Sequence, residues 1–185
     1  MARTPSTMSP LGTKAPPFAL PDVVDGRIVR LADFDAKGSL LVMFVCRHCP
    51  YVVHVADELA RLGRDHAERD VAIVAISSND AVAYPDDAPP RLAEFAKERG
   101  FVFPLLHDAT QEVARAYQAA CTPDFFVFDG GRSLVYRGQL DESRPNSGIP
   151  VTGRDLRAAL DRLLAGDLPD TDQKPSLGCN IKWKA

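Results

Sequence analysis

A short apolar segment followed at once by two closely spaced cysteines constrains this chain more than any other feature. Residues 40–45 (LLVMFV) are apolar without interruption, and residues 46–50 (CRHCP) follow directly. A run of this kind is typical of a strand that is buried on both faces of a parallel sheet, and a proline is well suited to the first turn of a helix. The sequence therefore predicts a C-x-x-C pair at a strand-to-helix junction.

This position favours redox chemistry for the two thiols. The backbone N–H groups and the positive dipole end of a helix stabilise an anion, so we expect the Cys46 thiol to ionise more easily than a free cysteine, with a pKa in the lower half of the range for such sites. Arg47 and His48 add positive charge beside it and should tune that pKa. We expect Cys46 and Cys49 to cycle between a dithiol and a disulfide.

Two other uses of a C-x-x-C pair fit the sequence less well. A closed zinc site needs two further Cys or His ligands at short spacing, and the chain has no second such pair. Cysteines that merely pack in a core are common, but the polar Arg47 and His48 between the two thiols argue against burial. We therefore expect neither a resident metal nor another cofactor.

Composition limits the partners and the compartment. The 185 residues carry a formal net charge of −3 without a basic block, so neither nucleic acid nor a membrane surface is an expected partner. No apolar run is long enough to span a bilayer, and residues 1–14 lack the apolar core of a secretory signal. Four unevenly placed cysteines are too few for a disulfide scaffold, so we expect a cytoplasmic protein with catalytic or redox-sensing thiols.

The order of the predicted elements indicates an α/β fold. Strands alternate with helices, which favours a central, mainly parallel sheet with helices on both faces, and a hairpin near the end adds antiparallel strands. Turn residues at Asp25-Gly26 and at Asp129-Gly130-Gly131 mark an opening and a later hairpin. The expected elements are a hairpin over 18–30, strands over 40–45, 71–76, 101–106, 125–128 and 134–136, and helices from Pro50 to about Gly63, over 89–99, after Asp108 with Gln111 reaching back to its cap, and over 152–164.

Three parts of the chain are expected. Residues 1–15 are rich in Pro, Ser and Thr and predict a flexible lead-in, and residues 16–167 form one domain. Residues 168–185 have no helical period, yet they contain Leu177 and Trp183, which need a place to bury. We expect this C-terminal tail to pack across the domain.

These features together resemble the thioredoxin fold, in which a C-x-x-C pair follows the first core strand and a Thr-Pro pair, here Thr122-Pro123, precedes a later hairpin. Within that superfamily the chain resembles the redoxin group, which contains the alkyl hydroperoxide reductase and thiol-specific antioxidant (AhpC/TSA) proteins, in a branch with the motif C-x-H-C-P-Y. The likeness extends over about residues 16–184 and includes residues 121–126 (CTPDFF) and 175–183 (PSLGCNIKW).

The resemblance implies roles for individual residues. Cys46 is implied as the nucleophile, and Cys49 as the cysteine that resolves the mixed disulfide. A cis peptide bond is implied before Pro123, which would place the backbone of Thr122 against the dithiol to hold a substrate as an added strand. The implied activity is thiol–disulfide exchange with protein or low-molecular-weight thiols and disulfides, sustained by a thiol reductant.

Two positions depart from the patterns of related families. Thioredoxins that reduce proteins carry a buried aspartate as a proton carrier six residues before the first cysteine, where this chain has Leu40. Peroxiredoxins carry P-x-x-x-T-x-x-C, but here Cys46 takes the place of the threonine and no such proline exists. We therefore expect either a different proton carrier or slow turnover. The missing motif argues against thiol-dependent peroxidase activity, which is the alternative function.

The two remaining cysteines leave several possibilities open. Cys121 lies two residues before Pro123, so it is either a buried thiol or a second redox group near the dithiol. Cys179 lies in the tail and would form a second redox pair if it sat beside Cys121 or Cys46.

Polar residues near strand ends suggest further site residues. The turn 77–80 (SSND) either lines the same cleft as Cys46 or is a plain surface loop. His107 combined with two thiolates would suit a copper or zinc carrier, which is a second class of function. His54 and His66 have polar neighbours and are expected to be exposed helix residues.

Overall fold

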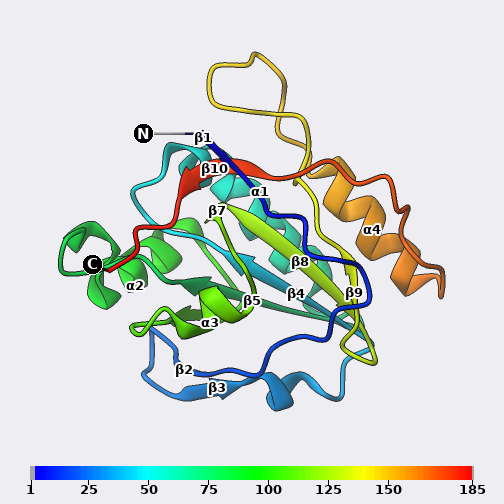
Figure 1. The fold of residues 1–185 in the computed structure, drawn as a ribbon, viewed down its shortest axis with the longest axis horizontal. Helices are drawn as coiled ribbons and strands as arrows, with labels where there is room; N and C mark the ends of the chain where they lie inside the picture. Colours follow the sequence, from blue (N-terminus) through cyan, green and yellow to red (C-terminus); the bar gives the residue numbers. More distant parts are fainter. Residues whose placement is uncertain (1–2, 185) are drawn as a thin grey trace.

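A computed structural model describes residues 3–184 (Figure 1). Its centre is a five-stranded sheet with the strand order β6-β5-β4-β8-β9. The first three strands in this order are parallel, and the last two form an antiparallel hairpin on the other side of β4. The chain thus has the predicted mixed α/β architecture of the thioredoxin fold. The strands are β4 (Ser39–Phe44), β5 (Val71–Ser77), β6 (Leu105–His107), β8 (Asp124–Asp129) and β9 (Leu134–Tyr136).

Two smaller sheets and several helices surround this sheet. β2 (Ala19–Pro21) and β3 (Ile28–Arg30) form the predicted opening hairpin. β1 (Arg3–Pro5), β10 (Leu177–Asn180) and β7 (Cys121–Thr122) form a three-stranded sheet in the order β1-β10-β7. The helices are α1 (Pro50–His66), α2 (Pro89–Arg99), α3 (Glu112–Ala116) and α4 (Arg154–Leu164), with 3-10 turns η1 (Leu31–Phe34) and η2 (Pro85–Asp87).

Successive side chains of the central strands point to opposite faces of the sheet and belong to two different apolar cores. Leu41 and Met43 of β4 belong to the core that α1, α2 and α4 cover, whereas Leu40 and Val42 belong to the core under α3 and the β2–β3 hairpin. All six residues of β4 are buried, which is the condition that the unbroken apolar run predicted.

The helix that follows the dithiol is longer than expected. Gly63 was predicted to end or kink it, but α1 continues to His66. A Cβ atom at Gly63 would lie 2.7 Å from the Phe103 ring, so this glycine permits close packing. His66 is buried, with Nδ1 2.9 Å from the Leu62 carbonyl oxygen, so the expectation of an exposed histidine was wrong.

Two further local predictions change in the structure. The strand expected over 101–106 is reduced to β6, which begins after Pro104 and lies at the sheet edge as the proline suggested. The Gln111 side chain does not reach back to a helix cap. It donates instead to the carbonyl oxygens of Ser78 (2.6 Å) and Lys182 (2.8 Å), and so ties the tail to the end of β5.

Both ends of the chain lie across the domain. Residues 3–15, for which a flexible lead-in was predicted, begin with β1, whose Arg3 pairs with Cys179 of β10; residues 1 and 2 lie outside the described part. The tail forms β10, drawn in red in Figure 1, and this strand pairs with β7. Trp183, expected to be buried, is instead 38% exposed and has the guanidinium of Arg115 4.5 Å above its ring.

A buried arginine explains why the N-terminal segment is held in place. Arg137 and Asp124 are almost fully buried and form an ion pair of 3.1 Å. The same guanidinium donates to Thr7 Oγ1 at 2.9 Å and to Ser6 Oγ at 3.4 Å, and it lies 3.8 Å from the centre of the Phe126 ring. Because a buried charge requires partners, this guanidinium binds the N-terminal segment to β8.

We expect Arg137→Met to lower the free energy of unfolding by about 3–5 kcal/mol, because it leaves the Asp124 carboxylate buried without its ion-pair partner. Denaturant titration followed by circular dichroism measures this change. The matched control is Arg154→Met, since Arg154 makes its ion pairs at the surface and should matter little. Equal stability of the two variants would contradict a stabilising role for the buried Arg137–Asp124 ion pair.

Candidate redox site

The two cysteines of the motif lie between β4 and α1, with Cys49 as the residue that precedes the helix. Both sulfurs face Thr122 of β7. Cys46 Sγ lies 3.2 Å from Thr122 Oγ1, and the Cys49 thiol donates to the Thr122 carbonyl oxygen at 3.2 Å. The Thr122–Pro123 peptide bond is cis. The structure therefore brings together the dithiol and the Thr-Pro pair that the sequence singled out.

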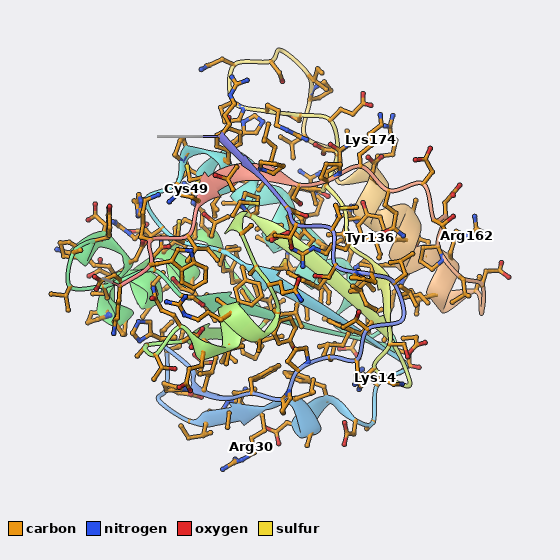
Figure 2. All side chains as sticks on the ribbon, in the orientation of Figure 1. Lys14, Arg30, Cys49, Tyr136, Arg162 and Lys174 are labelled. Atoms are coloured by element: carbon orange, nitrogen blue, oxygen red, sulfur yellow. The ribbon has the colours of Figure 1, made fainter. Side chains whose placement is uncertain are left out.

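Both sulfurs are buried, contrary to expectation. Cys46 is 1% exposed and Cys49 0%, whereas the neighbouring Arg47 and His48 are half-buried. The C-terminal tail contributes to this burial, because β10 pairs with β7 beside the dithiol, and His48 and Asp87 lie against Cys46. Figure 2 labels Cys49, which lies next to this strand. The polar residues between the cysteines thus reach solvent while the thiols do not.

The structure separates the roles of the other two cysteines. Cys179 stands opposite Thr122 in the β10–β7 pairing and hydrogen-bonds with Cys49, so it lies at the dithiol, and it is also close enough to Cys121 to interact with it electrostatically. Cys121 is also buried and directs its thiol at the Pro123 carbonyl oxygen at 3.6 Å. Burial raises the pKa of Cys121, which suits a packed thiol better than a reactive one.

A buried carboxylate that the sequence analysis missed lies beside the dithiol. Asp87, the last residue of η2, is completely buried. It accepts hydrogen bonds from the backbone N–H of Arg47 (2.7 Å) and from Asn79 Nδ2 (2.7 Å), and it binds His48 Nδ1 at 2.6 Å. Asn79 belongs to the polar turn 77–80, which therefore does border the dithiol. The residues around Asp87 look like any polar connection in the sequence, so no local signal identified it.

The positive charges beside Cys46 are paired rather than free. Arg47 lies 3.6 Å from Asp86, and His48 is bound to Asp87 and stacks on Tyr84 with ring centres 5.5 Å apart. The hydrogen bond to Asp87 raises the pKa of His48. Although burial opposes it, hydrogen bonds from His48 and Asn79 lower the pKa of Asp87.

This arrangement favours ionisation of Cys49 before Cys46, and the hydrogen bond from Cys49 to the Thr122 carbonyl oxygen belongs to the protonated form. A hydrogen bond from Cys46 lowers the pKa of Cys49 to about 5 against the effect of burial, with further help from Cys179 and from the backbone N–H of Val52. The same hydrogen bond, burial and the charge of Asp87 raise the pKa of Cys46. We expected the lowered pKa at Cys46. The helix N–H group that stabilises a thiolate points at Cys49 instead.

A group of possible metal ligands also occurs here. Ligand atoms of Cys46, His48 and Asp87 lie within 4.8 Å of one another. The hypothesis of a copper or zinc carrier depends on His107 as a ligand, but His107 lies on β6 and is not a member of this group. The Asp87 carboxylate already accepts hydrogen bonds from several donors, so the group has the character of a histidine–carboxylate pair beside a thiol.

The comparison with known proteins now identifies the family. Residues 11–137 match the AhpC/TSA family. The chain belongs to this family. A crystal structure of an uncharacterised conserved protein from Geobacillus kaustophilus is 56% identical, with a TM-score of 0.97, over 100% of this chain and 97% of that one.

Two curated relatives carry names of enzymes. A Mycobacterium tuberculosis protein, provisionally named a peroxiredoxin, is 32% identical over 116 residues, which are 63% of this chain and 68% of that protein. The thiol-disulfide oxidoreductase ResA of Geobacillus thermodenitrificans is 28% identical over 130 residues, 68% of this chain and 67% of that protein. The chain is thus a thioredoxin-like oxidoreductase of the redoxin group. Within residues 3–184, no helix has the length and apolar character needed to cross a membrane.

We expect the reduced protein to lose one thiol proton with a midpoint near pH 5, because Cys46 and Cys179 stabilise a Cys49 thiolate. Thiolate absorbance in the ultraviolet, followed against pH, measures this ionisation. The step should be absent in Cys49→Ser and should return to the ordinary value of about 8.5 in the denatured protein. A first midpoint above about pH 8 in the folded protein would remove this assignment.

We expect the pKa of His48 to fall to or below its ordinary value of about 6.5 in Asp87→Asn, because the carboxylate that raises it is lost while burial remains. In the native protein this bond stabilises the fold fully below about pH 6.5, and its contribution disappears as the pH rises through the raised value. Histidine resonances in NMR, assigned with His48→Gln, report the midpoint. Asp86→Asn is the control and should leave it unchanged; an unchanged midpoint in Asp87→Asn would refute the pairing.

Proposed function

We propose that this protein is a thiol–disulfide oxidoreductase that uses Cys46 and Cys49 as a redox dithiol. The observation that carries the proposal is the meeting of both sulfurs at Thr122, at 3.2 Å from its hydroxyl and its carbonyl oxygen. Membership of a family with a relative named for thiol–disulfide exchange supports the same reaction.

The hydrogen bond between the two cysteines supplies the proton chemistry. As Cys46 attacks one sulfur of a substrate disulfide, its proton passes to the Cys49 thiolate, the substrate S–S bond breaks, and Cys46 forms a mixed disulfide. The released substrate thiolate takes the proton from Cys49. Cys49 then attacks the Cys46 sulfur, forms the Cys46–Cys49 disulfide and releases the second thiolate. The separate carrier expected in place of an aspartate at Leu40 is therefore unnecessary.

The cycle is closed by a thiol reductant, which returns two electrons and opens the Cys46–Cys49 disulfide by the same exchange in reverse. We also propose a cytoplasmic location, because that compartment keeps such thiols reduced.

A thiol-dependent peroxidase is the second candidate, and it is favoured by the relative named as a peroxiredoxin. In that reaction Cys46 would attack a peroxide oxygen, the O–O bond would break with release of water or an alcohol, and Cys49 would then attack the sulfur of the resulting Cys46 sulfenic acid, forming the disulfide and releasing water. The two functions share the dithiol and differ in the bond that Cys46 attacks.

We expect Cys46→Ser to abolish turnover of hydroxyethyl disulfide, with dithiothreitol as the reductant, because the attacking sulfur is missing. Cys49→Ser should form the mixed disulfide at Cys46 more slowly, since the thiolate that takes the Cys46 proton is missing, and should release it several orders of magnitude more slowly, since intramolecular attack is lost. Thiol release and intact mass spectrometry measure both. Full activity of Cys46→Ser would exclude the mechanism, and rapid consumption of hydrogen peroxide without disulfide turnover would favour the peroxidase.

A further inference from the structure

We infer that the dithiol acts on low-molecular-weight disulfides and is closed to extended polypeptides, because the chain's own strand β10 occupies the edge of β7 on which a substrate strand would pair. The inference rests on the proposed function and names its substrate class. It follows from the pairing of β10, from its fit against Thr122, and from the different cover on the other side of Cys46.

The edge of β7 beside the dithiol is already paired. β10 runs antiparallel to β7, with Cys179 opposite Thr122 and Asn180 opposite Cys121. β1 pairs with the other edge of β10, from Arg3 to Pro5 (Figure 1). A substrate strand adds to a sheet through unpaired backbone groups, and here a strand of the same chain has taken them. Cys179 hydrogen-bonds with Cys49, so the tail also brings a thiol to the dithiol, as a peptide substrate would.

The fit of β10 against the Thr-Pro pair leaves no room for a second strand. A Cβ atom at Gly178 would stand 2.0 Å from the Thr122 carbonyl oxygen and 3.2 Å from the Pro123 nitrogen. Only glycine permits this approach, so the backbone of the tail lies directly against the Thr122–Pro123 peptide. The cavity beside Pro123, bordered by Tyr51 and Leu177, has a volume of about 20 Å³, which is enough for one water molecule and too small for a peptide side chain.

The tail is fastened on both sides of β10. Before it, Ser176 Oγ donates to the Gly138 carbonyl oxygen at 2.9 Å. After it, the Lys182 N–H donates to Asn79 Oδ1 at 2.8 Å, and the Lys184 N–H donates to Gln111 Oε1 at 2.8 Å. Because a peptide would have to displace these bonds together with the strand pairing, β10 acts as a fixed wall of the site.

Side chains rather than backbone cover Cys46 on its other side. Atoms of His48 and Asp87 lie within 4.8 Å of its sulfur, and His48 stacks on the exposed Tyr84. The adjoining ion pair of Arg47 with Asp86 is open to solvent, and such pairs contribute little to stability. Rotation of the partly exposed His48 and Tyr84 side chains would admit a small disulfide while β10 and the buried Asp87 stay in place, whereas an extended chain needs the occupied edge.

The test compares two disulfides with the full-length protein and dithiothreitol. We expect kcat/KM for hydroxyethyl disulfide to exceed that for insulin by at least about tenfold, since each 1.4 kcal/mol of opening cost slows access by that factor. Insulin reduction at an equal or higher rate would overturn the inference while leaving the proposed function standing. Turnover of neither disulfide would overturn the proposed function, and the inference with it.

Alanine substitutions at two separate glycines, Gly178 and Gly131, provide a test variant and its control. Gly178→Ala should lift β10 from Thr122 and raise insulin turnover about tenfold relative to hydroxyethyl disulfide, which corresponds to 1.4 kcal/mol of opening. Gly131→Ala is the control, because a Cβ atom there meets only an ordinary contact of 3.4 Å. If both variants keep the wild-type preference, the tail does not set it, and the inference fails.

A second measurement holds even if Gly178→Ala does not fold. In the wild-type protein, iodoacetamide should modify the dithiol, Cys46 or Cys49, much faster than a maleimide carried on a long polyethylene glycol chain does, when each rate is divided by its rate on the urea-unfolded protein. Peptide mass spectrometry identifies the modified cysteine. Equal relative rates for the two reagents in the folded protein would show that the site is open to large molecules and would refute the inference.

Discussion

Thr122 is the residue on which the site depends. Its hydroxyl oxygen lies against Cys46, its carbonyl oxygen accepts the Cys49 thiol, and its backbone pairs with the strand that carries Cys179. One residue thus fixes the distance between the reacting sulfurs and the cover above them. A movement of the tail would change the surroundings of the dithiol, because the tail packs against the Thr122 peptide and hydrogen-bonds with Cys49 through Cys179.

The second organising feature is the pairing of the charged groups beside the dithiol with Asp86 and Asp87. Asp87 binds the backbone N–H of Arg47 and the ring of His48, so the groups that could stabilise a thiolate at Cys46 are already engaged. When the pair loses a proton, the negative charge is favoured on Cys49, beside the start of α1. The site therefore keeps its mobile proton between two sulfurs, which is consistent with an apolar Leu40 where related enzymes carry an acid.

Local patterns in the sequence predicted the elements that position the dithiol but not the burial of its sulfurs. The apolar run of β4, the helical spacing of α1 and the Thr122-Pro123 pair are each encoded within a few residues, and all three take their predicted places. Burial of the sulfurs depends on β1, β7 and β10, which come from three distant parts of the chain. Asp87 was missed for the same reason, since its partners Asn79 and Arg47 meet it only in the folded protein. The composition of the N-terminal segment predicts flexibility, because it gives no sign of the buried Arg137 that binds this segment.

The position of β10 in the chain also has a consequence for biosynthesis. Translation supplies both cysteines of the motif, and then Thr122, well before residues 177–180 leave the ribosome. At about 5–20 residues per second, a nascent chain spends seconds with the edge of β7 unpaired and the thiols uncovered. In that interval the dithiol lacks the cover of β10, which the pairing of β10 with β7 then supplies.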